Sequence, residues 1–270
     1  MVARVKARLA GVFVYPIKSC APMVVEAAEV ERRGLKHDRR WMLVDEHGLF
    51  VTGRQFGSLV RVTVNAGQHG LHVSAPGMEA LTVRVPKPDE RRRVSIWGEA
   101  LSVIDAGDAA AEWFSHFSGR SLRLVYADAA MQRPVDPAFG QADDPVAFPD
   151  GYPVLLLSQA AVDELSLRVG RIMETGRFRP NLVVEGVAAH AEDGWKRVRV
   201  GSVLFDVVKP CIRCIFTTVD PLTGERSADG EPLSSLKAYR HNGKGITFGQ
   251  NLIPRSKGSV HVGDVLEVLD

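Results

Sequence analysis

Short apolar or alternating runs, broken by Gly, Pro and Asp, recur along most of this 270-residue chain. Runs with such breaks between them are typical of β-strands joined by turns. In the first half of the chain they predict strands at residues 12–15, 23–30, 41–45, 49–52, 60–65, 71–74, 81–85, 94–96 and 101–104. Many short strands at near-regular spacing are typical of a barrel or a sandwich.

Two stretches instead space their apolar residues as an amphipathic helix does. The first covers residues 108–117, with Asp108 as the expected N-cap and Gly119 as the stop. The second runs from an expected N-cap at Ser158 to Gly170. Between them, residues 127–151 are rich in Asp, Pro, Gly and Ala and show no periodicity. That stretch predicts a surface or active-site loop that marks a domain junction.

The second half of the chain returns to strand-like runs, at residues 153–157, 182–185, 198–200, 203–208, 214–219, 246–252 and 265–269. A short helical turn is expected from Pro232 to Tyr239. Taken together, the runs predict an α+β fold that is predominantly β, with a few helices. The length allows one large domain or two closely packed ones.

The charge balance and the cysteine count argue against several classes of protein. With 34 Lys and Arg against 32 Asp and Glu, the net charge is only +2, which disfavours a dedicated nucleic-acid binder. No apolar run approaches the roughly 18 residues that a membrane span needs, so we expect no membrane span. Three cysteines cannot form a closed disulfide framework, which predicts a reducing, cytoplasmic setting.

Two of the three cysteines, Cys211 and Cys214, stand three positions apart, with Lys209 and Arg213 beside them. A thiolate is both a soft metal ligand and a nucleophile, and neighbouring positive charges lower its pKa. The β-branched and aromatic residues 215–219 that follow predict a strand. The pattern therefore predicts a thiol at a strand edge among basic groups, and several roles for it have to be weighed.

A zinc site needs four ligands, but one Cys-x-x-Cys pair supplies two, and Cys20 and the eight histidines lie at no recognisable partner spacing. A thioredoxin-type redox pair needs its first cysteine at the start of a helix, whereas a strand is expected here. Both cysteines could also be small buried hydrophobic side chains. On a strand, positions 211 and 214 face opposite sides, so one ligand and one packed thiol is the simplest interpretation.

Several blocks of sequence, in order along nearly the whole chain, resemble one known family. Residues 209–224 resemble the signature of MOSC domains, which are named for the C-terminal domain of molybdenum cofactor sulfurase. The remaining blocks lie at residues 14–20, 34–41, 51–55, 177–181 and 247–251. The chain looks most like the mitochondrial amidoxime-reducing component and its bacterial relatives. The resemblance implies a MOSC N-terminal β-barrel domain at residues 1–126 and a MOSC β-barrel domain at residues 127–270.

The resemblance also implies a cofactor, Mo-molybdopterin, whose metal is bound by one cysteine thiolate. It places that catalytic ligand at Cys214 and leaves Cys211 as a packed or auxiliary thiol. The cofactor carries a phosphate and a fused pterin ring, so its pocket needs cations and hydrogen-bonding groups. The residues implied to bind it are Lys18, Ser19, Arg39, Arg179, Asn181 and Cys214. One departure from the family pattern is Ile212, which stands where relatives commonly have Ser.

The implied activity is reduction of small N-hydroxylated compounds: amidoximes, hydroxylamines or N-hydroxylated bases. A plant-type ferredoxin module would need four cysteines, and no such module or membrane anchor is evident in the sequence. Electrons are therefore expected from a separate partner of the ferredoxin, flavodoxin or cytochrome b5 type, the last with its reductase. Two alternatives remain: a sulfur carrier with a persulfide on Cys214, and a non-catalytic protein that binds or delivers the molybdenum cofactor.

Overall fold

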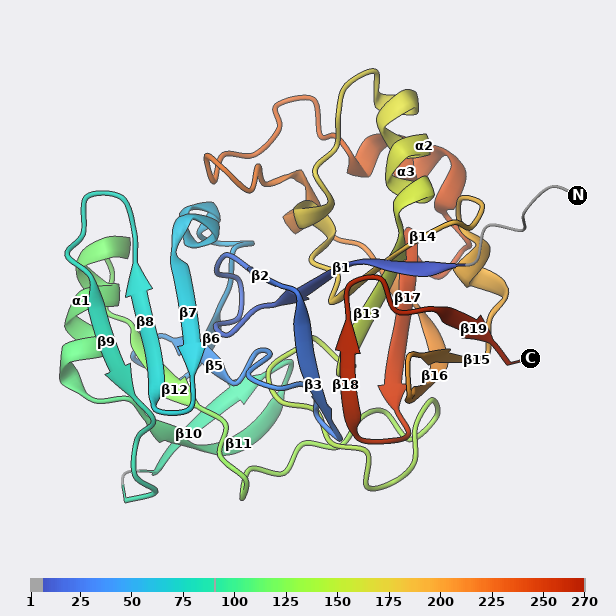
Figure 1. Ribbon diagram of the computed structural model, residues 1–270. Coiled ribbons are helices and arrows are strands. Elements are labelled where there is room, and N and C mark those ends of the chain that lie inside the picture. The colour runs from blue at the N-terminus through green and yellow to red at the C-terminus, as the bar shows by residue number, and fades with distance from the viewer. Residues whose placement is uncertain (1–6, 90, 270) are drawn as a thin grey trace, which may run out of the picture.

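The structure is a computed structural model, and it describes residues 7–89 and 91–269. Its largest sheet covers the second half of the chain and is shown on the right of Figure 1. The strands of this sheet lie in the order β19 (Leu266–Val268), β15 (Arg197–Val200), β16 (Val203–Ile212), β17 (Thr247–Pro254), β13 (Val154–Ser158), β14 (Leu182–Glu185), β1 (Arg8–Val14) and β2 (Met23–Val25). Neighbouring strands are antiparallel except β13 and β14.

Smaller sheets make up the rest of the described chain. A five-stranded sheet has the order β10 (Arg91–Ile96), β11 (Glu99–Asp105), β12 (Arg123–Tyr126), β5 (Trp41–Val44) and β6 (Phe50–Val51). Two three-stranded sheets have the orders β7 (Thr63–Gly67), β8 (Gly70–Ser74), β9 (Leu81–Arg84), and β18 (Gly258–His261), β3 (Ala27–Glu31), β4 (Gly34–Leu35). The predicted α+β fold, predominantly β, is confirmed.

Helices are few and short. The α-helices are α1 (Asp108–Ser118), α2 (Gln159–Val169) and α3 (Leu233–Arg240). The 3₁₀ turns are η1 (Gly57–Arg61), η2 (Thr175–Phe178), η3 (Ala191–Gly194) and η4 (Ile215–Thr218). Gly119 and Gly170 end α1 and α2 in the left-handed conformation, with φ of 68° and 77°, as the sequence predicts. Residues 127–151 contain no helix or named strand, which confirms the expected loop.

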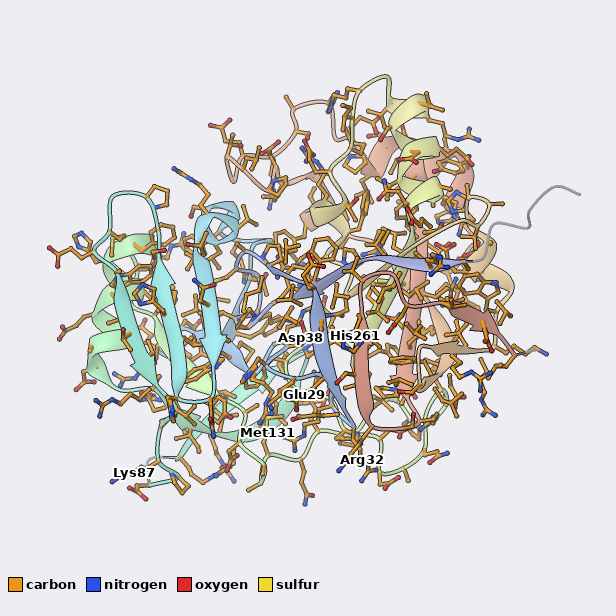
Figure 2. All side chains as sticks on the ribbon, viewed as in Figure 1. Glu29, Arg32, Asp38, Lys87, Met131 and His261 are labelled. Carbon is orange, nitrogen blue, oxygen red and sulfur yellow. The ribbon has the colours of Figure 1, made fainter. Side chains whose placement is uncertain are left out.

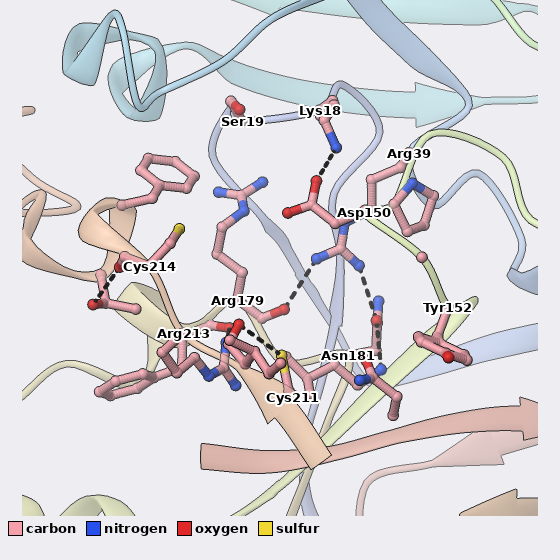
Figure 3. A pocket seen from close by; sticks show the side chains of 18 of the residues that line it. Lys18, Ser19, Arg39, Asp150, Tyr152, Arg179, Asn181, Cys211, Arg213 and Cys214 are labelled. Carbon is pink, nitrogen blue, oxygen red and sulfur yellow. Dashed lines mark hydrogen bonds and ion pairs between the residues drawn. The ribbon is translucent and has the colours of Figure 1, made fainter. Parts of the chain in front are cut away.

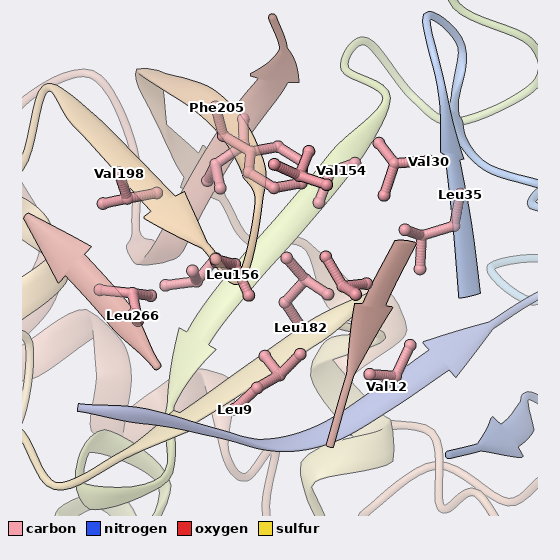
Figure 4. Packing of buried hydrophobic residues seen from close by; sticks show 14 of the residues in the cluster. Leu9, Val12, Val30, Leu35, Val154, Leu156, Leu182, Val198, Phe205 and Leu266 are labelled. Atoms are coloured by element: carbon pink, nitrogen blue, oxygen red, sulfur yellow. The ribbon is translucent and has the colours of Figure 1, made fainter. Parts of the chain in front are cut away.

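The two halves of the chain share strands. β1 pairs with β14, and β3 pairs with β18 near the C-terminus, so residues 8–31 belong to sheets of the second half. Figure 4 shows the resulting core, in which Leu9 and Val30 pack with Leu156 and Leu182. The alternation of apolar residues along β1 aims one face of the strand into this core. Between the halves lies Asp38, which is almost fully buried (Figure 2). The boundary between 126 and 127 stays a prediction.

One predicted strand is wrong, and it lies at the cysteine pair. β16 ends at Ile212, and residues 215–218 form the 3₁₀ turn η4 with Cys214 extended before it, at φ −131° and ψ 179°. The Thr217 hydroxyl donates to the carbonyl of Cys214 (3.0 Å), and Thr218 makes the same contact one residue further on. These local bonds compete with a strand ladder. The expected opposition of positions 211 and 214 across one strand therefore does not apply.

Three other predictions need smaller corrections. The run at 23–30 is two strands, β2 and β3, which pair in different sheets. The run at 60–65 begins as η1 and becomes a strand only at Thr63. Asp108 is the first residue of α1, and Gly107 is its N-cap, while Ser158 caps α2 without a side-chain bond. Cap positions depend on backbone angles that composition leaves open by a residue or so.

Candidate active site

A pocket lies between the halves of the chain, and all of the residues predicted to bind the cofactor line it (Figure 3). Loops and strand ends supply them: Lys18 and Ser19 follow β1, Arg39 precedes β5, Arg179 ends η2, Asn181 precedes β14, and Cys214 follows β16. Their convergence is a property of the fold, since the two outermost of them are separated by almost 200 positions. Their individual roles stay predictions.

The cation at Cys214 is Arg54, which the sequence analysis did not single out. Its Nε donates to the Cys214 Sγ at 3.2 Å. Its Nη2 donates to the Asp150 carboxylate at 2.6 Å, and the other oxygen of that carboxylate accepts from the buried Lys18 amine. A chain of charged contacts, Lys18–Asp150–Arg54–Cys214, therefore runs along the pocket.

The electrostatics of this chain follow from burial and charge. Burial lowers the pKa of Lys18 from 10.5 to about 8, although the neighbouring Asp150 carboxylate opposes the shift. Desolvation alone would raise the pKa of Asp150, but the positive charges of Lys18 and Arg54 outweigh it and hold that pKa below its usual range. Asp150 is therefore an anion that keeps both cations in place.

Two glycine positions explain how Arg54 reaches the sulfur. A Cβ at Gly53 would collide with the ring of Phe216, and a Cβ at Gly57 would collide with the carbonyl oxygen of Gly224. The loop after β6 therefore lies directly against the segment that follows Cys214. Arg226 adds a hydrogen bond to the Arg54 carbonyl. The block at residues 51–55 that resembles the family contains Arg54, but nothing in its spacing indicates a partner 160 residues away.

The basic neighbours in the sequence are directed elsewhere. Arg213 Nε and Nη1 donate to the carbonyls of Phe248 and Phe178, each at 2.8 Å. Lys209 lies over the ring of Phe139, at 4.3 Å from its centre. Burial raises the pKa of Cys211, although the nearby charge of Arg213 opposes it. Arg213 therefore acts on Cys211 through its charge, whereas the cation in contact with Cys214 is Arg54.

Arg39 and Asn181 form a closed network with Asp38. Arg39 Nη1 donates to the Asp38 carboxylate (2.7 Å) and to Asn181 Oδ1 (2.9 Å). Asn181 Nδ2 donates to Asp38 Oδ1 (2.9 Å) and to the carbonyl of Phe13 (3.0 Å). Asn181 Oδ1 also accepts from the backbone of Leu155, so its amide is fully bonded within the protein. In this arrangement Asn181 holds Arg39 in position, and the amide group of Asn181 has no free donor or acceptor for a ligand.

Arg179 is the contrasting case. Its guanidinium lies over the ring of Tyr15, 4.2 Å from the ring centre, and near that of Phe216 at 5.5 Å. Its Nη2 is buried and finds no hydrogen-bond partner among residues 7–89 and 91–269. Burial lowers its pKa to about 10, so it stays charged at neutral pH. An unpaired buried cation suits an anionic ligand.

Backbone strain gathers at the same place. Within the described ranges, six residues other than glycine have a positive φ, and Ser19 (72°), Arg39 (44°) and Arg179 (54°) among them line the pocket. Such conformations cost of order 1–3 kcal/mol each and cluster at functional sites. The strain fixes the directions of two cations and a hydroxyl at the pocket wall.

Two expectations about the wider chain can be compared with the structure. In the part of the chain that the structure describes, no group of three or more His, Cys, Asp or Glu side chains is placed to hold a metal, so a zinc site gains no support. No described helix has the length and apolar character that crossing a bilayer requires. The cytoplasmic setting stays a prediction.

Comparison with known proteins covers both halves of the chain. Residues 6–121 match the MOSC N-terminal beta barrel domain family, and residues 143–267 match the MOSC domain family. Mitochondrial amidoxime-reducing component 1 of Danio rerio is 37% identical over 268 residues, which cover 93% of this chain and 81% of that protein. The Mus musculus protein of the same name is 35% identical over 280 residues, covering 97% and 82%. Mitochondrial amidoxime reducing component 2 of Bos taurus is 37% identical over 238 residues, covering 84% and 70%.

Proposed function

This chain belongs to the family of MOSC-domain proteins that includes the mitochondrial amidoxime-reducing components, and we propose that it is a molybdenum-cofactor-dependent oxidoreductase of N-hydroxylated substrates. Amidoximes, hydroxylamines and N-hydroxylated bases are the proposed substrates. The observation that carries the proposal is the joint presence, in one pocket, of the Cys214 thiol and the Arg179 guanidinium, whose buried Nη2 has no hydrogen-bond partner among the described residues. The names of the relatives support the substrate class.

The side chains of the pocket fit the proposed cofactor. A thiol held in place by a guanidinium suits a soft metal, because sulfur is a soft ligand. The excess of cations suits an anion with a phosphate, and the buried Nη2 of Arg179 has no partner in the part of the chain that the structure describes. We propose that Cys214 binds the metal and that Lys18, Ser19 and Arg179 bind the phosphate or the pterin, with Arg39 supporting them. When bound, the cofactor supplies the two-electron redox chemistry that the protein side chains lack.

The protein's own residues then position the Cys214 side chain and shield the site from water. Arg54 fixes the Cys214 side chain through its Nε, while Asp150 fixes Arg54. Gly53 lets the Phe216 ring close one side of the site. Ile212, which is half exposed, lines the pocket where relatives commonly have a hydroxyl and makes that part of the wall apolar. We propose that this wall excludes water from the side on which the substrate enters.

We further propose that electrons reach the site from a separate donor protein, of the ferredoxin, flavodoxin or cytochrome b5 type with its reductase. The relatives' names support this, since each is called a component. The sequence also holds only three cysteines, whereas a plant-type ferredoxin cluster needs four. Cys20, moreover, is fully buried and lies far from Cys211 and Cys214 in the sequence.

The deciding experiment compares two cysteine variants. The protein is produced in a host that makes molybdopterin, and its molybdenum and pterin contents are measured beside turnover of benzamidoxime with a chemical electron donor. We expect Cys214→Ala to lose both metal and turnover, since the thiolate ligand is gone, and Cys211→Ala to keep both. Equal losses in the two variants would contradict the assignment of roles. Metal-free protein with a cyanolysable sulfur would support a sulfur carrier, and loaded protein without turnover would support a delivery protein.

A further inference from the structure

One tryptophan is placed differently from the others in the chain. Trp41 and Trp113 are buried and Trp195 packs against the core, but Trp97 is 49% exposed. It lies in the two-residue turn between β10 and β11, where Ile96 pairs with Glu99. A large apolar ring in such a turn gains little from folding, so its position needs another explanation.

The backbone at Trp97 is also strained. Its φ is 53°, and that of the following Gly98 is 85°, so both central residues of the turn are left-handed. Hairpin turns of this type strongly favour Asn-Gly or Asp-Gly, because a bulky side chain is unfavourable at a positive φ. A sequence that breaks this local preference, with the side chain packed on a residue that lines a pocket, is typical of a functional position.

The indole ring lies against the residue that contacts the site sulfur. Its centre is 4.8 Å from the guanidinium carbon of Arg54 and 4.9 Å from the ring centre of Phe50. The Arg54 nitrogens are directed at Cys214 and Asp150, and its flat face is covered by Trp97. Arg54 lines the pocket and Trp97 packs on it, so the indole lies one side chain away from the sulfur.

Two aliphatic side chains close to Cys214 are exposed as well. Ile212, in the pocket wall, is 50% exposed, and Ile215, next to Cys214, is 46% exposed. The surface near Arg54 and Cys214 thus carries an exposed aromatic ring and two exposed aliphatic side chains, beside a pocket lined by several cations. Such a surface favours a flat apolar group that leaves its polar end toward the sulfur.

We propose that Trp97 is a specificity-determining residue, an aromatic platform that favours substrates whose N-hydroxylated group is attached to an aromatic ring. The proposal rests on the proposed reductase function. It assigns the ring a part in substrate binding and none in the chemistry, so its loss raises KM for aromatic substrates and leaves kcat nearly unchanged.

The test uses the cofactor-loaded protein, two substrates with the same reacting group and two variants. Trp97→Asn removes the ring but keeps the turn, since Asn-Gly suits this hairpin, and Trp97→Phe keeps an aromatic face. For benzamidoxime we expect KM to rise about 10-fold in Trp97→Asn and about 3-fold in Trp97→Phe. For the aliphatic acetamidoxime, KM changes less than about 2-fold, because the platform has no ring to contact. Equal changes for the two substrates, or a fall in kcat at constant KM, would overturn the proposal, the latter showing that the ring only holds Arg54.

A binding measurement separates this proposal from the proposed function. Benzamidoxime is titrated into wild-type protein, Trp97→Phe and Trp195→Phe while tryptophan emission is recorded. We expect the ligand to change the emission of the wild type and of Trp195→Phe, and to leave that of Trp97→Phe unchanged. A change that persists in Trp97→Phe, or none in the wild type, rejects the platform. If the wild type turns over neither substrate, the proposed function fails, and the emission result still decides the role of Trp97.

Discussion

Two walls of the pocket hold buried charges in opposite ways. In the closed wall, made of Asp38, Arg39 and Asn181, carboxylate, guanidinium and amide bond to one another and to the backbone. In the open wall, made of Arg54, Arg179 and Cys214, Arg54 donates to the sulfur, and a buried nitrogen of Arg179 has no partner among the residues that the structure describes. Buried polar groups normally find partners within the protein. The polar groups of the closed wall thus have their partners within the protein, whereas the open wall leaves groups to which a ligand can bind.

The largest effect should come from breaking the closed wall. In Asp38→Ala, Arg39 becomes a buried cation without its partner, and Asn181 and the Tyr15 backbone lose an acceptor. We expect the free energy of unfolding to fall by about 3–5 kcal/mol, measured by denaturant titration.

A matched control is the exposed pair of Asp143 and Arg32 (Figure 2 labels Arg32). Asp143→Ala removes a carboxylate that is also paired with an arginine but is exposed to water. We therefore expect the free energy of unfolding to fall by less than about 1 kcal/mol. Similar losses in Asp38→Ala and Asp143→Ala would show that the closed wall does not carry the stability assigned to it.

Lys18 is an intermediate case, since it is bonded but carries a lowered pKa. Its pKa falls from 10.5 to about 8 on folding, so between pH 8 and 10 the unfolded chain binds more protons than the folded one. Stability contributed by this group therefore rises with pH across that window. Relative to Lys18→Met, the wild type should gain about 2–3 kcal/mol from pH 7 to 10.

The comparison with a variant cancels the other titrating groups, such as the buried tyrosines. Lys87, an exposed residue in the turn between β9 and β10, provides the control (Figure 2). The difference between the wild type and Lys18→Met should change with pH by about 2–3 kcal/mol more than the difference between the wild type and Lys87→Met. Equal changes in the two differences would mean that the Lys18 amine is better solvated than its burial indicates.

The contrast between the walls also explains what the sequence could predict. Strand positions, the helix stops at Gly119 and Gly170, and the irregular segment 127–151 follow from local pattern, and the structure confirms them. The family blocks indicated Lys18, Arg39 and Arg179, which the pocket brings together. Local pattern was wrong at residues 215–219, because two threonine hydroxyls bond the preceding turn there.

Contacts between segments far apart in the sequence could not be predicted from local pattern. Arg54 meets Cys214 only because Gly53 admits the ring of Phe216, and Asp150 comes from a segment that shows no periodicity. Neither the composition nor the spacing of residues indicates these contacts. The basic residues nearest in sequence, Lys209 and Arg213, were natural candidates, but Lys209 lies over an aromatic ring and Arg213, just after β16, donates to backbone carbonyls.

The smallest effect on stability is expected in the open wall. Arg179→Met removes a partly buried charge whose Nη2 has no hydrogen-bond partner within residues 7–89 and 91–269, and replaces it with an apolar chain of similar length. The relief of desolvation offsets the lost contacts with the rings of Tyr15 and Phe216, so the free energy of unfolding should change by less than about 1 kcal/mol. Molybdopterin content, measured on the same preparation, should nevertheless fall severely, because the proposed anion site is gone. A loss of stability like that of Asp38→Ala, with cofactor retained, would show that Arg179 belongs to the structure of the protein and would remove the distinction between the two walls.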